Sequence, residues 1–239
     1  IIETGSDISS SFFGEVITVD DKDVKLNYPE FIQGYPVIKN AEIKNIFGET
    51  KDYNLDKLDL IVDSKLQTCA DTQIKLWFLY NKNLMEQGLI NDIQFEIANG
   101  ETLKYNSDGT YSFWGGNEKM TTKDENLDRG FNNWIKNVFA YANSGSLIEN
   151  LISLEDLNDL KPGDLIIYNP DESGYGHTKG IKEILEIPPG SGNLYYELFA
   201  GSDPAIDARI YNKVETREEL LNALQSGQIK VRRYPNLNI

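Results

Sequence analysis

The chain has few of the residues on which disulfide and metal chemistry depend. Its 239 residues include one cysteine and one histidine. A single cysteine cannot form an internal disulfide or a thiolate zinc cluster, and a single histidine excludes a His-rich metal site. We therefore expect no metal and no other cofactor. A reaction that needs both a thiol and an imidazole has one pair available, Cys69 and His177.

Basic residues and long apolar runs are also scarce. Lysine and arginine number 23 against 38 acidic residues, which gives a formal net charge of −15. This charge argues against nucleic acid as a partner, because binding to phosphates depends on clustered basic side chains. No apolar run approaches the roughly 20 residues that span a bilayer, so we expect no membrane insertion.

The start of the chain bears on its location. It begins at Ile1 and carries no basic-then-apolar signal sequence. This start fits either the removal of a leader or the boundary of a fragment cut from a longer chain, and we expect an extracytoplasmic protein, which is secreted, periplasmic or anchored at the surface.

Composition is that of a folded protein, with 40% hydrophobic and 11% aromatic residues. We assign residues 1–60 to peripheral strands and loops and residues 61–239 to the main domain. A helix is predicted over 69–80, because Ala70, Ile74 and Trp77 follow helical spacing. Further helices are predicted over 127–139, 147–160 and 217–225, and strands over 56–62, 93–97, 102–105, 165–168, 177–185, 193–199 and 228–233. The polar stretch 117–126 is predicted to be a loop.

This order of elements is typical of an α+β fold. We expect the helix that begins near Cys69 to pack on an antiparallel sheet formed by the segments 165–168, 177–185 and 193–199. At a helix N-terminus, the helix dipole and free N–H groups favour a thiolate and predict a lowered pKa for Cys69. His177, at a strand start, would then act as the base. The alternative is a buried structural cysteine and a surface histidine.

Several short motifs, taken in order, resemble those of a known group of proteins. They are Gln67-Thr-Cys-Ala-Asp71, the turn Asn99-Gly100, the run Trp134 to Ala142, Gly163-Asp164 and Gly176-His177. Together they resemble an uncharacterised bacterial family with a Gln-Cys-Ala-Asp motif and a later Gly-His motif. That arrangement is similar to papain-like, NlpC-type cysteine hydrolases. The resemblance covers roughly residues 60–210.

The resemblance implies a papain-like fold and a role for individual residues. Cys69 matches the nucleophile, His177 matches the base, and Gln67 matches a donor to the oxyanion. The residue that should orient the imidazole is replaced by Gly201, which has no side chain. Ser202 and Asp203 are the candidate substitutes, and we take Asp203 as the third catalytic residue.

Four residues are candidates for substrate binding: Asp71, Trp114, Tyr175 and Ser202. Asp71 has an alternative role in the first helical turn, where a carboxylate interacts favourably with the helix dipole. Trp114, beside two glycines, either lines a groove or covers the core.

The function expected from this pattern is that of a secreted bacterial cysteine hydrolase, a peptidase or amidase. Its substrate would be a peptide, including one related to the cell wall. One alternative is a papain-like binding or structural protein with a weak or inactive site. Another is a carbohydrate-binding or carbohydrate-active module.

Overall fold

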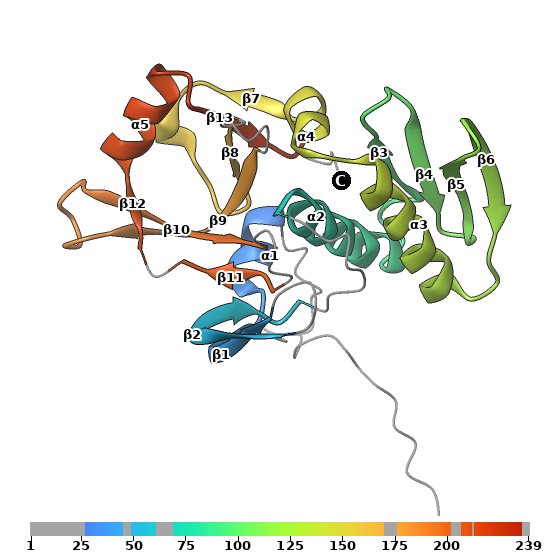
Figure 1. Cartoon of the computed structure of the whole chain (residues 1–239), viewed down its shortest axis with the longest axis horizontal. Helices are drawn as coiled ribbons and strands as arrows, with labels where there is room; N and C mark the ends of the chain where they lie inside the picture. Colours follow the sequence, from blue (N-terminus) through green and yellow to red (C-terminus); the bar gives the residue numbers. More distant parts are fainter. Residues whose placement is uncertain are drawn as a thin grey trace, which may run out of the picture.

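The computed structural model describes residues 27–44, 49–60, 69–169, 176–201, 207–211 and 213–235. These residues form a mixed α+β fold with antiparallel sheets (Figure 1). The described helices are α1 (Tyr28–Gly34), α2 (Cys69–Glu86), α3 (Leu127–Tyr141), α4 (Ser144–Asn150), α5 (Arg217–Gln225) and the 3₁₀ helix η1 (Leu157–Asp159). None of these helices has the length and apolar character needed to cross a membrane.

The larger sheet contains nine strands and carries the N-terminal segment at one edge. Its strands are β1 (Val37–Lys44), β2 (Thr50–Leu58), β7 (Ile152–Leu154), β8 (Leu165–Tyr168), β9 (His177–Glu186), β10 (Leu194–Ala200), β11 (Arg209–Ile210), β12 (Glu215–Thr216) and β13 (Ile229–Arg233). They follow the order β1-β2-β11-β10-β9-β8-β13-β7, with β12 paired to β10. The predicted antiparallel set is confirmed, since β8, β9 and β10 are antiparallel neighbours.

Strand β8 illustrates why a central strand of this sheet has apolar residues at consecutive positions in the sequence. Leu165 and Ile167 belong to the core that contains α2, whereas Ile166 belongs to a second core beneath α5. Successive side chains of a strand point to opposite faces, so a strand covered on both faces needs apolar residues at every position. The sheet therefore separates two layers of helices (Figure 1).

Helix α2 lies between the larger sheet and the smaller one (Figure 1). It begins at Cys69, as predicted, and continues to Glu86 beyond the predicted end at residue 80. Buried residues occur on every side of the helix, not only along the apolar stripe. They include Thr72, Gln73 and Lys75. A helix covered on all sides is expected at the centre of a fold.

The smaller sheet contains β3 (Asp92–Glu96), β4 (Thr102–Asn106), β5 (Thr110–Gly115) and β6 (Glu118–Lys123) in that order. The predicted β3–β4 hairpin is confirmed by the pairing of Phe95 with Leu103. The prediction of a loop over 117–126 is wrong, because β6 lies within it. Most side chains of β6 are exposed, so the strand lacks the alternation of apolar and polar residues that would reveal it.

Two other local predictions need correction. The helix predicted over 147–160 ends at Asn150 and is followed by β7 and η1. Strand β7 forms by pairing with distant β13, where Leu154 lies opposite Val231. Helix α1 lies within residues 1–60, for which strands and loops are predicted, so that prediction is wrong over this helix. Asn27 and Glu30 form a capping box at its start, and Pro29 occupies its first turn, where proline is tolerated.

Gly180 on β9 allows α2 to approach the larger sheet closely. A Cβ atom at position 180 would lie 2.5 Å from Gln73 Oε1 and 2.5 Å from Phe199 Cζ. Gln73 is one turn beyond Cys69, so this contact sets the position of the first turns of α2 against β9. The absence of a side chain at Gly180 therefore determines how closely Cys69 lies to β9.

We predict that Gly180→Ala lowers the free energy of unfolding by about 1–3 kcal/mol, because the added methyl group overpacks the α2–β9 contact. Urea denaturation measures this change. Gly34→Ala is the matched control, since a Cβ atom at position 34 would extend into open space and the φ of this residue is not positive. The control should change stability by less than about 0.5 kcal/mol. Equal effects of the two substitutions would contradict the prediction.

Candidate active site

Cys69 is the first residue of α2 and lies against the beginning of β9. Burial raises the pKa of its thiol above the ordinary value, and the nearby Asp71 carboxylate acts in the same direction. The backbone N–H groups of Thr178 and Ala70 hydrogen-bond to the sulfur and oppose this shift. The predicted lowering of the pKa is therefore wrong, because desolvation outweighs the backbone hydrogen bonds to the sulfur. The thiol is protonated at neutral pH.

His177 is the first residue of β9, as predicted. Side chains alternate along this strand, so Thr178 and Gly180 face the helical layer of α2. His177 shares the other face with Lys179. Burial lowers the pKa of His177 to about 4, and the positive charges of Lys179 and Arg209 add to this effect. The imidazole is therefore neutral at neutral pH.

The thiol and the imidazole are neighbours through the backbone. Within the described part of the chain, no hydrogen bond joins the two groups. However, the thiol accepts a hydrogen bond from the N–H of Thr178, which is bonded directly to His177. The thiol therefore lies beside the backbone at the start of β9, next to the residue that carries the imidazole.

Tyr211, directly after β11, is the hydrogen-bond partner of the imidazole. Its hydroxyl lies 3.0 Å from His177 Nε2. Burial raises the pKa of Tyr211, a hydrogen bond from Arg209 lowers it, and Cys69 is near enough to influence it. Tyr211 is thus within hydrogen-bond distance of the imidazole and within electrostatic range of the thiol.

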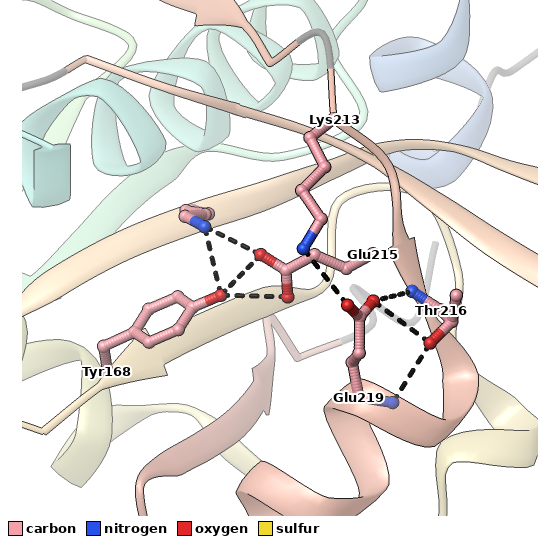
Figure 2. Close-up of polar contacts among 6 residues, drawn as sticks. Tyr168, Lys213, Glu215, Thr216 and Glu219 are labelled. Atoms are coloured by element: carbon pink, nitrogen blue, oxygen red, sulfur yellow. Dashed lines mark hydrogen bonds and ion pairs between the residues drawn. The ribbon is translucent and has the colours of Figure 1, made fainter.

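Charged groups surround this tyrosine. The Lys179 ammonium lies 4.9 Å from the centre of the Tyr211 ring, and the Arg209 guanidinium carbon lies 5.0 Å from it. Lys179 also forms an ion pair with Glu215 at 2.8 Å. The same carboxylate accepts hydrogen bonds from the Tyr168 hydroxyl at 2.8 and 3.0 Å (Figure 2). Glu215 thus balances the charge of Lys179.

The other predicted site residues are placed differently. Asp71 is buried in the first turn of α2, beside Cys69, where its charge disfavours the thiolate. Trp114 lies on β5 of the smaller sheet, across α2 from β9, and its backbone N–H donates to Asn137 Oδ1 at 2.8 Å (Figure 1). The structure does not bring it to the cysteine. Four candidates lie outside the described residues: Gln67, Tyr175, Ser202 and Asp203.

The sequence reasoning did not identify three residues of this cluster: Lys179, Arg209 and Tyr211. The position of Lys179 could have been predicted from the sequence, since it is two residues after His177 and so lies on the same face of the strand. Arg209 and Tyr211 carry none, because their position depends on the pairing of the short strand β11 with β10 and β2.

Comparison with protein families places the chain in a family. The family model described as "Domain of unknown function (4846)" matches residues 21–191, and the chain belongs to this family. The matched region contains Cys69 and His177 and ends before Arg209 and Tyr211. No curated protein and no solved structure matches the chain.

The lowered pKa of His177 predicts a pH dependence of stability. The ordinary pKa is 6.5 and the folded value is about 4. Between these values the unfolded chain binds more protons, so stability is complete above the higher value and is lost as the pH falls toward the lower one. The contribution of this residue has a slope below about 1.4 kcal/mol per pH unit. Urea denaturation gives the free energy of unfolding of wild type and of His177→Gln at each pH. The difference between the two values is the contribution of His177.

Nuclear magnetic resonance gives an independent measurement, because the protein has one histidine. The His177 ring signals should titrate near pH 4. Titration near 6.5 in the folded protein would contradict the burial of a neutral imidazole.

The raised pKa of Cys69 predicts slow alkylation of the folded protein at neutral pH. The rate constant with iodoacetamide should rise with an apparent pKa above the unperturbed value of about 8.5. The same measurement in urea gives the ordinary pKa of this one cysteine. A folded-state pKa below that of the unfolded chain would instead indicate a resting thiolate.

Proposed function

We propose that this member of the family is a cysteine hydrolase with a papain-like arrangement, which cleaves amide or ester bonds. Cys69 is the nucleophile and His177 is the general base and acid. One observation carries the proposal: the thiol at the start of α2 is hydrogen-bonded to the backbone of Thr178, the residue after a histidine whose Nε2 is already held by Tyr211. A helix that starts with cysteine and packs on an antiparallel strand that starts with histidine also fits the papain-like arrangement.

The reaction starts from an uncharged pair. Cys69 Sγ attacks the carbonyl carbon while its proton moves to His177 Nδ1, and the carbonyl π electrons move to the oxygen. The tetrahedral intermediate then collapses, the carbon–nitrogen or carbon–oxygen bond breaks, and His177 gives the proton to the leaving group. Water attacks the thioester with His177 as base, the carbon–sulfur bond breaks, and the thiol is restored.

Two sets of groups support these steps. The N-terminus of α2 carries a partial positive charge that can stabilise the developing oxyanion. The Gln67 side chain is a further donor on the basis of the resemblance. Tyr211 acts as a positioning residue: when His177 is protonated, Nε2–H donates to the phenol oxygen, which also accepts from Arg209.

The alternative is a papain-like scaffold with a weak or inactive site. The raised pKa of the Cys69 thiol favours this alternative, because a protonated thiol is a poor nucleophile. In the proposed hydrolase, general-base assistance by His177 compensates for this. Peptides, including cell-wall-related ones, and an extracytoplasmic location are proposed on the resemblance alone.

Hydrolysis of p-nitrophenyl acetate tests the proposal. The folded wild type should release a burst of nitrophenolate and carry an acetyl thioester on Cys69, detected by mass spectrometry. His177→Ala should slow acylation on the order of a hundredfold, as expected for a lost general base. Tyr211→Phe should slow it about tenfold, the value of one hydrogen bond.

Cys69→Ala and Tyr141→Phe are the controls. The first should abolish the burst, and the second should leave it unchanged, since Tyr141 is an exposed tyrosine on α3. A wild type that is not acylated when folded would favour the inactive scaffold. A burst that survives Cys69→Ala would contradict the role of the thiol.

A further inference from the structure

Two side chains from outside β9 meet at Thr178, the second residue of that strand. The backbone N–H of Thr178 hydrogen-bonds to the Cys69 sulfur. Its side-chain oxygen Oγ1 lies 3.1 Å from Ser144 Oγ, at the start of α4. Thr178 is fully buried, and Ser144 is half-buried. One residue of β9 therefore connects α4 to the thiol.

Strand β9 is paired on one side where it reaches this residue. The pairs between β9 and β10 end at Gly180, which lies opposite Phe199, whereas the pairs with β8 continue to His177. On the side of β9 away from β8, the Thr178 N–H donates to the sulfur. The hydroxyl contact with α4 thus holds the end of the strand where the ladder with β10 has stopped.

Helix α4 can hold Thr178 because it is itself fixed to both sheets (Figure 1). Arg232 of β13, in the larger sheet, donates from Nε to the carbonyl oxygen of Ile148 at 2.9 Å. Asn150, the last residue of α4, donates from Nδ2 to the carbonyl oxygen of Glu96 on β3, in the smaller sheet, at 3.2 Å. Ser144 is therefore presented to β9 from a helix with a set position.

We propose that Ser144 is a positioning residue for the nucleophile, and that its hydroxyl contact with Thr178 keeps the Thr178 N–H on the Cys69 sulfur. Its part in hydrolysis rests on the proposed function, whereas its hold on the thiol does not. A hydrogen bond from an N–H group favours the thiolate over the thiol. Ser144 would in this way stabilise the sulfur as it loses its proton to His177.

Alkylation of the full folded chain with iodoacetamide tests this proposal, because the protein has one cysteine. Ser144→Ala should raise the pKa of Cys69 further and slow alkylation at neutral pH by about threefold to tenfold, the range for one lost hydrogen bond. The rate constants of variant and wild type should converge as the pH rises above both pKa values. Ser144→Thr keeps a hydroxyl and should restore the wild-type profile.

A merely structural role for Ser144 gives the opposite sign. Loosened packing would admit water to the thiol, relieve the desolvation that raises its pKa, and speed alkylation. Faster labelling of Ser144→Ala, or an unchanged pH profile, would overturn the proposal. Ser226→Ala is the matched control, since Ser226 Oγ donates to the Ala223 carbonyl at 3.1 Å at the exposed end of α5. It should leave the profile unchanged.

Removal of the other hydroxyl gives a second test. Thr178→Val keeps the backbone N–H and should slow alkylation as much as Ser144→Ala does. The double variant should be no slower than either single one, because all three lack the same contact. It should also regain part of the stability lost in the single variants, measured by urea denaturation, because no hydroxyl of the pair is left without its partner. Slowing that adds up in the double variant would contradict a shared contact.

The outcomes separate this inference from the proposed function. A wild type that is not acylated by p-nitrophenyl acetate, with slowed alkylation in Ser144→Ala, would overturn the hydrolase and leave the hold on the thiol intact. An acylated wild type whose alkylation profile does not change in Ser144→Ala or Thr178→Val would overturn the role of Ser144 alone.

Discussion

The position of the candidate site depends on the close contact between α2 and β9. Gly180 has no side chain, and Gln73 and Phe199 occupy the space where a Cβ atom would lie. This contact allows the first turn of α2 to reach the backbone of Thr178 and fixes the thiol one residue from the histidine. A larger residue at position 180 would move the helix, and with it the cysteine, away from the strand.

Desolvation determines the charge state of the pair. Burial acts in opposite directions on the two groups, raising the pKa of the Cys69 thiol and lowering that of His177 to about 4. Both effects disfavour an ion pair, although a helix N-terminus faces the sulfur. The site therefore differs from one that holds a resting thiolate, and the proposed hydrolysis depends on proton transfer during the attack.

The large sheet brings the remaining groups to this pair. Strand β9 presents His177 and Lys179 on one face, and β11 with the residue after it brings Arg209 and Tyr211 beside them. In the proposed site, Tyr211 takes the role for which Gly201 offers no side chain. The fold thus supplies an imidazole partner from a segment 34 residues after the histidine.

The sequence by itself determined the local elements. Helical spacing identified α2 and α3, and apolar runs identified β8, β9 and β10, because these signals arise from residues close in the chain. It also identified Cys69 and His177 as the one thiol–imidazole pair. Helix α1, strand β6 and the break after α4 were missed, since a short capped turn, an exposed strand and pairing with distant β13 leave little periodic pattern. Only the tertiary structure decided that burial outweighs the backbone hydrogen bonds at Cys69 and that Tyr211 and Arg209 approach His177. Both outcomes depend on contacts between residues distant in sequence, which no local pattern records.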